Sequence, residues 1–466
     1  MVTRQVTNDR HAIDGKIRPA DERFDVVVVG AGTAGTAAAI AAAKDGGTVL
    51  LIDENPVRGE MIGTDVPLFF GGRMTAAVQS PERMVEQLFA SNPALEEAFD
   101  AGVDVRLGTC VWGLYVNGPA MRALPEPLLG IADGEGAKMV GFGRLLLATG
   151  ARDVVLGFEG WNRPGVMGAQ GFAMLLTRYD ALASRRILVV GGGELGRSTA
   201  RLALDRGLEV AGIVDLGEIE PVGDIPLFPF HTIASAEGGI DGVERAVLAS
   251  LSGDERTTLD CDTIVLAITA APATELLDAA GTVPGETIEL IGDCATVPRP
   301  EPALLAAWSA ALGRHASPDT MVCQCEEVTR ADLIGVQPPN YLDRPPAMAA
   351  RSLSTLLNDG PAHPDQIKRL TRAGMGACQG RRCREQVACL LAAEQGTTPD
   401  RVPIASFRAP VRPIPLGILA DWNERPEMAA GWDVWFGIPT QWLPYAIIGT
   451  PEEAELIAGL GGNMHV

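Results

Sequence analysis

Four of the eight cysteines in this chain of 466 residues stand at short spacings from one another. The first pair reads Cys323-Gln-Cys325 and the second reads Cys378-Gln-Gly-Arg-Arg-Cys383. Thiols paired in this way are the ligands of a four-thiolate zinc site or of an iron–sulfur cluster. Because zinc-binding pairs are usually separated by about two to four residues, the C-x-C pair fits zinc poorly. We therefore favour a [2Fe-2S] cluster and keep zinc as the alternative.

The segments around these cysteines carry further features that suit a cluster. Glycines beside the second pair allow the backbone to wrap closely round a cluster and to point N–H groups at its sulfurs. A helix capped by Thr329 is expected after Cys325, and a basic helix from Ile367 is expected to end in the glycine-rich turn. Cys389 lies in an apolar helix, residues 387–393, and is expected to be core rather than ligand. The basic residues that offset the charge of four thiolates are Lys368, Arg369, Arg372, Arg381 and Arg382.

Two nucleotide-binding folds precede the cysteines. The first begins at Phe24 with an apolar strand, a glycine-rich turn, an Ala-rich helix and a second apolar strand that ends on an acid. Glycines in such a turn permit a tight bend, close approach of backbone N–H groups to a pyrophosphate, and close packing of helix on strand. These glycines are Gly30, Gly32 and Gly35. Asp53 would accept the ribose hydroxyls, with Glu54 as the substitute if the strand register differs by one residue.

The second fold begins at Arg185 and repeats the glycine fingerprint. Its glycines are Gly191, Gly193 and Gly196. The next strand ends at Asp215, which could bind a ribose diol and so favours NAD over NADP. We expect a second nucleotide here, NAD or ATP, although inserted domains of this kind also persist as scaffolds without a ligand. Neither fold contains Cys-x-x-Cys, so disulfide exchange is not expected, and Cys110, Cys261 and Cys294 are predicted to be buried small hydrophobic residues.

Composition sets limits on the partners and the compartment. The 59 acidic and 38 basic residues give a net charge of -21, which argues against nucleic acid or an anionic membrane as the main partner. The polar N-terminus has no apolar stretch of signal-peptide length, and the apolar runs are too short for a membrane span. Closely spaced free thiols favour a reducing compartment, so a cytoplasmic location is expected.

Later motifs resemble those of flavoproteins with two dinucleotide-binding domains, such as thioredoxin reductase. A strand ending in Thr149-Gly150 and another ending in Gly292-Asp293 match signatures of this class. The resemblance implies FAD, with Thr149 and Gly150 beside the cofactor, Asp293 on its ribityl or phosphate part, and Val111 against the adenine. One departure is Arg58-Gly59-Glu60, which stands where relatives usually carry Gly-Gly-Gln.

The cysteine segment resembles the bacterioferritin-associated-ferredoxin-like [2Fe-2S] module. Together with the motif from Arg412 to Gly417, it resembles the FAD-containing α or A subunits of opine oxidases, hydrogen cyanide synthase and related amino-acid dehydrogenases. The match spans residues 24–419, and its strongest motif runs from Thr371 to Cys383. Two parts depart from the family pattern: a Pro-rich spacer, Pro338 to Pro346, and a Trp-rich segment after Leu419.

The predicted fold class is α/β, a two-dinucleotide-domain flavoprotein with a small α-rich [2Fe-2S] domain. Expected divisions are a polar extension (1–23), an FAD domain (24–160 and 268–316), an inserted nucleotide domain (161–267), a cluster domain (317–400) and a Pro/Trp-rich arm (401–466). The resemblance implies an electron-transfer subunit of an amine or opine-type dehydrogenase. Its partner would be a β subunit resembling glycine or D-amino-acid oxidase, with a small ferredoxin-like subunit in some complexes. The alternatives are a stand-alone NAD(P)H-dependent flavoprotein reductase and a zinc-stabilised scaffold.

Overall fold

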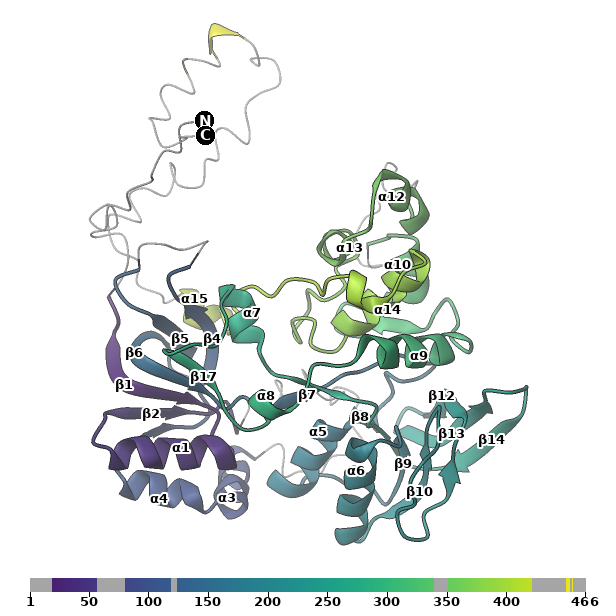
Figure 1. Ribbon diagram of the computed structural model, residues 1–466, viewed down its shortest axis with the longest axis horizontal. Coiled ribbons are helices and arrows are strands. Elements are labelled where there is room, and N and C mark those ends of the chain that lie inside the picture. The colour runs from purple at the N-terminus through teal and green to yellow at the C-terminus, as the bar shows by residue number, and fades with distance from the viewer. Residues whose placement is uncertain are drawn as a thin grey trace.

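The computed structural model describes residues 19–56, 80–118, 124–338, 351–420, 450–452 and 455 (Figure 1). Three features singled out above therefore lie outside the described residues. They are Arg58-Gly59-Glu60, nearly all of the Pro-rich spacer, and the Trp-rich segment.

The first sheet is built round a long buried strand, β6, which pairs in parallel with β1 and β17 and antiparallel with β5. Its strands are β1 (Glu22–Val29), β2 (Val49–Ile52), β3 (Asp104–Arg106), β4 (Cys110–Tyr115), β5 (Leu128–Ala132), β6 (Ala137–Leu147) and β17 (Ile288–Leu290). The order β3-β2-β1-β6-β5-β4 places β1 centrally, and its apolar run Val27–Val29 is buried on both faces, as parallel strands usually are. Helices α1 (Thr33–Lys44) and α4 (Ala94–Asp100) contact each other below this sheet, with α3 (Pro81–Ser91) beside them (Figure 1).

The second sheet repeats the same strand–helix–strand arrangement. Its order is β11-β10-β9-β15-β8, and the pairs formed by β9 and β10, β9 and β15, and β15 and β8 are all parallel. The elements are β8 (Val166–Gly168), α5 (Ala169–Ala173), β9 (Arg186–Val190), α6 (Glu194–Asp205), β10 (Glu209–Val214), β11 (Leu227–Phe228) and β15 (Thr263–Leu266). A three-stranded sheet, made by β12 (His231–Gly239), β13 (Gly242–Ser250) and β14 (Arg256–Asp260), lies beside it.

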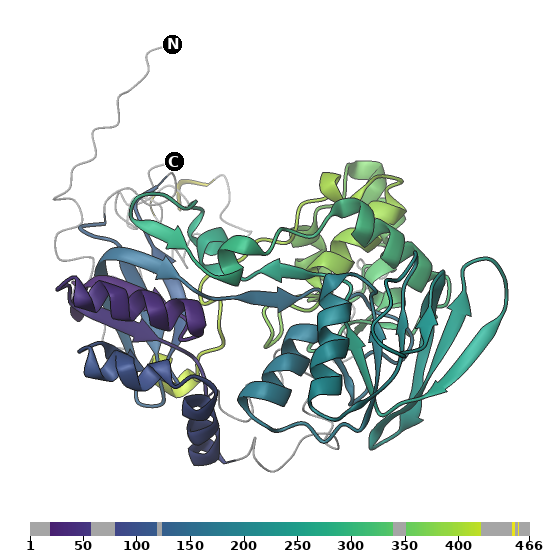
Figure 2. The same cartoon turned by 60° about the horizontal axis from the view of Figure 1, so that its bottom comes forward.

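Two short strands connect the halves of the molecule. β7 (Ala151–Asp153) leaves the first sheet and β16 (Ala270–Pro272) returns to it, and the two pair with each other (Figure 2). After β16 come α7 (Glu275–Ala280), β17, α8 (Asp293–Thr296) and α9 (Pro302–Gly313). The second fold is thus inserted between strands of the first. Two largely parallel sheets, each with helices packed against it, confirm the predicted α/β architecture with two dinucleotide-binding folds.

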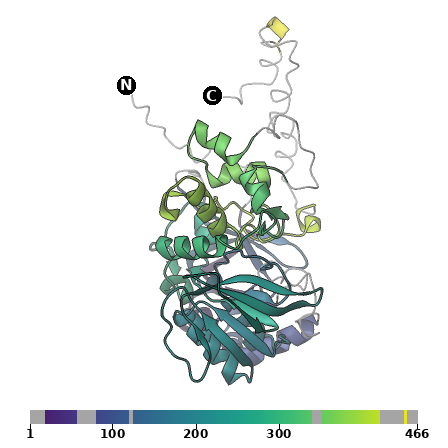
Figure 3. The ribbon, with the colours of Figure 1, turned by 90° about the vertical axis from the view of Figure 1, so that its right-hand side faces the viewer.

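The cysteine region forms a separate group of short helices (Figure 3). Its elements are β18 (Met321–Cys323), β19 (Val328–Thr329), α10 (Arg330–Ile334), α12 (Leu353–Asp359), α13 (Pro364–Thr371) and α14 (Arg384–Glu394). Thr329 caps α10 by accepting from the backbone N–H of Asp332, and α13 ends just before the glycine-rich turn, so both helix predictions are confirmed. Helix α14 packs on α9 and so joins this region to the body. Within the described ranges, no helix combines the length and apolar character needed to cross a bilayer.

Candidate functional site

The first glycine loop, residues 30–35, follows β1 and leads into α1. Gly30 has φ +108°, and a Cβ at this position would lie 2.2 Å from the carbonyl oxygen of Ala148. At Gly35 a Cβ would lie 1.9 Å from the Gly30 carbonyl oxygen, so neither position accepts a larger residue without a shift of backbone. A Cβ at Gly32 would meet nothing within 4 Å. The loop therefore has open space where backbone N–H groups could receive a phosphate.

Asp53 is the acid that contacts this loop. Its Oδ2 accepts the Ala31 N–H at 2.6 Å, and its Oδ1 accepts the backbone and side-chain N–H groups of Asn55 at 2.8 and 2.7 Å. Glu54 points elsewhere and forms an ion pair with Arg412. Of the two predicted acids, Asp53 thus lies at the glycine loop, while Glu54 holds the C-terminal arm.

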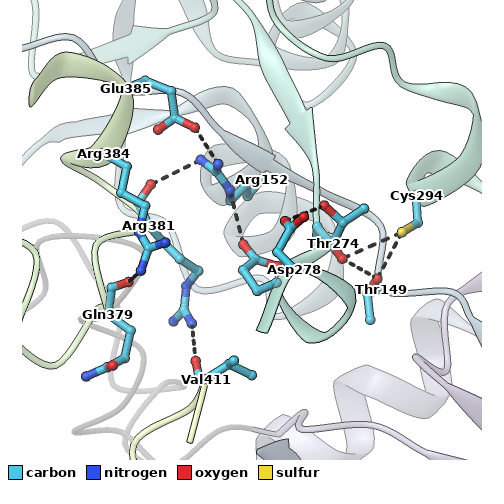
Figure 4. A network of polar contacts seen from close by, with 12 residues as sticks. Thr149, Arg152, Thr274, Asp278, Cys294, Gln379, Arg381, Arg384, Glu385 and Val411 are labelled. Atoms are coloured by element: carbon cyan, nitrogen blue, oxygen red, sulfur yellow. Dashed lines mark hydrogen bonds and ion pairs between the residues drawn. The ribbon is translucent and has the colours of Figure 1, made fainter. Parts of the chain in front are cut away.

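The other residues predicted for FAD gather round the same edge of the sheet. Gly292 has φ +64°, and a Cβ there would lie 2.8 Å from the Cβ of Ala34, so the Gly292-Asp293 turn lies against the start of α1. The Thr149 hydroxyl donates to the Ala273 carbonyl at 2.7 Å and contacts the Cys294 Sγ at 3.1 Å (Figure 4). The next residue, Gly150, has φ +72°. These positions follow different strands of the first sheet and meet at their carboxyl ends.

Val111 lies on β4, at the edge of the first sheet, and is buried. The N–H of Thr109, two residues earlier, donates to the Asp53 carbonyl at 3.0 Å. The strand that carries Val111 therefore begins beside the acid expected at the ribose.

The second glycine loop, residues 191–196, has matching geometry. Gly191 has φ +115°, and Cβ atoms at Gly191 and Gly196 would lie 2.4 Å from the Ala267 oxygen and 1.8 Å from the Gly191 oxygen. Space is open at Gly193, where a Cβ would meet nothing within 4 Å. Asp215 accepts the N–H groups of Gly192 at 2.6 Å and Gly217 at 2.9 Å. The four predicted residues of this site are thus together.

The four cysteines of the two motifs also come together. Cys323 and Cys383 hydrogen bond through their thiols, as do Cys325 and Cys378, and the electrostatic interactions of Cys383 extend to all three other sulfurs. The Gly374 N–H donates to the Cys323 Sγ at 3.4 Å. Cys325 is exposed and the other three are buried. The described part of the chain nonetheless holds no group of three or more Cys, His, Asp or Glu side chains already arranged as a metal site.

The protonation of these thiols follows from their pairing. In the pair formed by Cys325 and Cys378, the hydrogen bond from Cys325 lowers the pKa of Cys378 to about 6. The Arg382 N–H and the charges of Arg381 and Arg382 contribute to this lowering of the pKa. The same hydrogen bond, followed by burial, raises the pKa of Cys325. In the pair formed by Cys323 and Cys383, the hydrogen bond from Cys383 lowers the pKa of Cys323. In each pair, one sulfur therefore has a lowered pKa, which favours its thiolate form.

Arginines surround the cysteine loop, residues 378–383. The Arg382 guanidinium lies 5.1 Å from the centre of the Trp161 ring and donates to Gln324 at 2.9 Å. Arg384 is buried, stacks 3.3 Å above the Phe407 ring, and donates to the carbonyls of Ala405 and Gln379 at 2.5 and 2.8 Å. Burial lowers the pKa of Arg384 to about 10. Of the predicted basic residues, Arg381 and Arg382 thus act on the Cys378 thiol, Arg372 forms an ion pair with Glu326, and Arg384 is an addition.

Arg152 lies on β7, in the two-stranded β7–β16 pair that follows β6, and its side chain contacts the cysteine loop (Figure 4). Its side chain contacts Glu275 at 3.1 Å, forms an ion pair with Glu385 of α14, and donates to the carbonyl of Arg381 at 3.2 Å. Arg381 in turn donates to the Val411 carbonyl at 3.4 Å. Arg152 lies two residues after Gly150, but no local sequence pattern marks it as a functional residue.

The remaining cysteines divide by burial. Cys389 is buried in a hydrophobic core shared by the second fold and α9, as expected for a core residue. Cys261 and Cys294 are also buried, whereas Cys110 is only partly so, and the prediction for Cys110 is wrong to that extent. Its place at the start of β4, near the Glu54–Arg412 pair, explains the difference.

Comparison with known proteins identifies two family segments. Residues 24–303 match the pyridine nucleotide-disulphide oxidoreductase family, and residues 340–422 match the sarcosine oxidase A3 domain. The second match contains Cys378 and Cys383 but begins after Cys325.

Curated relatives agree with the family predicted above. The A subunit of opine oxidase from Agrobacterium tumefaciens is 24% identical, over 85% of this chain and 91% of that protein. The HcnB subunit of hydrogen cyanide synthase from Pseudomonas aeruginosa is 26% identical, over 77% of this chain and 90% of that protein. The alpha subunit of sarcosine oxidase from Rhizobium meliloti is 26% identical over 85% of this chain, but only 42% of that longer protein is covered.

Among solved structures, L-proline dehydrogenase from P. horikoshii has a TM-score of 0.52 and 19% identity, and it covers 85% of this chain and 80% of its own. That likeness concerns the fold alone. The match over residues 24–303, more than half of the chain, carries the assignment. The chain therefore belongs to the pyridine nucleotide-disulphide oxidoreductase family and is an oxidoreductase.

Proposed function

We propose that this chain is the FAD- and [2Fe-2S]-containing electron-transfer subunit of a multi-subunit amine or opine-type dehydrogenase or oxidase. FAD bound at the first fold would supply two-electron chemistry, and a cluster held by the four cysteines would supply one-electron transfer. A partner β subunit, resembling glycine or D-amino-acid oxidase, oxidises the C–N bond. A small ferredoxin-like subunit completes some complexes of this kind.

The observation that carries the proposal is the gathering of four thiols beside the first fold. The donor set suits a cluster because two thiol pairs from distant segments meet, one N–H points at a sulfur, and arginines supply positive charge. Cys323, Cys325, Cys378 and Cys383 would hold the irons. The hydrogen-bonded thiol pairs are then the protonated form of the site, which iron binding would convert to thiolates with release of protons.

The first fold fits FAD through its open glycine loop. Gly32 leaves room for the pyrophosphate, Asp53 would turn from the Ala31 N–H to the ribose hydroxyls, and the Gly292-Asp293 turn stands at the start of α1. Relatives that are themselves the A or alpha components of oxidases support a role within a complex. A cytoplasmic location follows from the need to keep the four thiols reduced.

Metal and flavin analysis of the anaerobically purified chain tests this proposal. We expect one flavin and about two irons per chain, with the absorption of both groups. Cys323→Ser and Cys378→Ser should each remove most of the iron. Cys389→Ala changes a buried cysteine of the same region that we place in the core, and it should keep the iron. Zinc in place of iron would refute the proposal.

A second candidate activity rests on the second glycine loop, whose geometry is intact. With NAD bound at Gly191, Gly193, Gly196 and Asp215, the chain would act as an NAD(P)H-dependent flavoprotein reductase. Rapid bleaching of the flavin by NADH, without any other subunit, would favour this activity. If NADH leaves the flavin oxidised while the assembled complex reduces it with an amine substrate, the electron-transfer role holds.

A further inference from the structure

Arg152 on β7 lies between the predicted flavin contacts Thr149 and Gly150 and the cysteine loop. We propose that Arg152 is a positioning residue, which holds the cysteine loop, residues 378–383, at a fixed place relative to the flavin site. This inference rests on the proposed function, because it gives the fixed placement its purpose. Arg152 itself is neither oxidised nor reduced and transfers no proton.

The side chain of Arg152 makes three contacts with three different segments. Nε lies 3.1 Å from Glu275, the first residue of α7. Nη2 pairs with Glu385, in the first turn of α14. Nη1 donates at 3.2 Å to the carbonyl of Arg381. A planar guanidinium with five N–H donors in a fixed fork can make all three contacts at once, which a lysine ammonium on a single stem cannot.

These contacts reach the cysteine loop through its own backbone. Arg381 stands between Cys378 and Cys383, and Glu385 follows Cys383 by two residues. On the other side, Arg152 follows Thr149-Gly150 by two residues and lies in the β7–β16 pair. The Arg152 side chain thus spans from the segment of the predicted flavin contacts to the cysteine loop, in addition to the packing of α14 on α9 and the contact of Arg382 with Trp161.

Burial makes this junction stiff. The Glu385 side chain is 3% exposed, that of Glu275 is 12% exposed, and that of Arg152 is 14% exposed. Ionised groups removed from water in this way keep their geometry only when each is paired, and loss of one partner leaves a buried charge uncompensated. The single positive charge of Arg152 would be balanced by one carboxylate, yet Glu275 and Glu385 both contact it. Their arrangement on α7 and α14 therefore serves to fix the relative position of these helices.

Electron transfer between two protein-bound groups slows steeply as their separation grows, so a fixed loop sustains the rate. We expect Arg152→Gln to retain flavin and to keep iron when loaded anaerobically, but to loosen residues 378–385. Hydrogen–deuterium exchange of that segment should become faster. The single-turnover rate of cluster reduction by the reduced flavin should fall by about tenfold or more, since small misplacements of reacting groups have effects of this size. Arg152→Lys should give an exchange rate and a transfer rate between those of the unmodified protein and those of Arg152→Gln.

Arg144→Gln is the matched control. Arg144 lies on β6 of the first sheet and, like Arg152, pairs with a glutamate, Glu289, but this pair is exposed and, among the described residues, forms no hydrogen bond or ion pair with the cysteine loop. Its exchange pattern and transfer rate should equal those of the unmodified protein. If Arg152→Gln also leaves both readouts unchanged, with flavin and iron present, the inference is wrong while the proposed function stands. If the unmodified protein contains no iron, it is the proposed function that fails.

A double variant separates positioning from charge balance. Arg152→Gln leaves Glu385 buried beside fewer cations, and adding Glu385→Gln removes that charge. We expect the double variant to regain thermal stability, yet to keep fast exchange at residues 378–385 and slow transfer, because the contact with the Arg381 carbonyl is still missing. Recovery of both exchange protection and transfer rate would show that Arg152 acts only as a counter-charge, and would overturn the inference.

Discussion

The two glycine loops have almost the same backbone but different surroundings. The first glycines have φ values of +108° and +115°, and each is packed against the chain after a neighbouring strand, where a Cβ would strike a carbonyl oxygen. Asp53 and Asp215 each accept, at 2.6 Å, the N–H of the residue that follows the first glycine. Backbone geometry alone therefore does not distinguish a flavin site from a second nucleotide site.

The surroundings differ at the N-terminus of the helix that follows each loop. Helix α1 has no acidic residue in its first turn, whereas α6 begins with Glu194. This carboxylate pairs with Arg197 and Arg201, and a Cβ at Gly192 would lie 3.0 Å from the Ile219 side chain. A negative charge at the helix N-terminus competes with a phosphate for the same partial positive charge. We therefore propose that the first loop holds its ligand more tightly than the second.

The largest effect is expected from filling the close helix–strand contact. In Gly35→Ala the new Cβ would lie 1.9 Å from the Gly30 oxygen, and in Gly196→Ala it would lie 1.8 Å from the Gly191 oxygen. Overpacking of this kind costs about 1–3 kcal/mol and must displace the loop. Gly35→Ala should therefore lose most of its flavin, while Gly196→Ala keeps it. Flavin-to-protein absorbance ratios measure this loss, and equal loss in both variants would show that the flavin site does not depend on the first loop alone.

Substitution of the acid at each loop, Asp53 or Asp215, should give the next largest effect on ligand binding. Asp53→Asn replaces a carboxylate by an amide, which weakens the hydrogen bonds to a ribose by about 1–2 kcal/mol. We expect flavin dissociation to be about tenfold more favourable in Asp53→Asn. Asp215→Asn should leave flavin binding unchanged and weaken only a nucleotide bound in the second fold. Flavin release measured by fluorescence in both variants decides between these outcomes, and flavin loss from Asp215→Asn alone would reverse the assignment.

Removal of the charge at α6 should have a smaller effect of opposite sign. Hydrogen bonds from Arg197 and Arg201 lower the pKa of Glu194 below the ordinary value of a glutamate, so the side chain stays ionised at neutral pH and acidification to pH 6 leaves its charge in place. Glu194→Gln should increase NAD affinity of the second fold by about two- to fivefold, as expected for one screened charge near a helix N-terminus. Calorimetric titration with NAD measures this change. Weaker binding in Glu194→Gln would mean that this carboxylate supports the ligand.

The smallest effect is expected at the ion pair of Arg412 with Glu54. This partly exposed pair ties the C-terminal arm to the first fold and should contribute about 1 kcal/mol or less. Arg412→Ala should lower the thermal midpoint slightly and leave flavin content unchanged. Flavin loss as large as that in Asp53→Asn would show instead that the arm takes part in the flavin site.

Much of the architecture could be predicted because short-range patterns specify it. An apolar strand, three glycines at fixed spacing and an acid after the next strand define a βαβ unit locally, and both units form as predicted. The Thr329 cap likewise depends on residues within one helical turn.

The joints between the folds could not be predicted in this way. Arg152 and Glu385 are separated by 233 positions, and Arg412 and Glu54 by 358, so no local pattern records either pair. The choice between Asp53 and Glu54 also needed the structure, because a shift of one residue exchanges the two faces of a strand. The meeting of the thiol pairs depends on the path of the chain between Cys325 and Cys378, which spacing alone does not define.

The most direct test follows electrons from the first fold to the cysteines. The chain is purified anaerobically with its co-purifying subunits, mixed with an N-alkyl amino acid, and frozen at intervals for electron paramagnetic resonance. We predict that flavin bleaching is followed by the signal of a reduced [2Fe-2S] cluster, and that Cys378→Ser abolishes this signal without preventing bleaching. Full bleaching with an iron-loaded cluster that never becomes reduced would contradict the proposed electron-transfer role.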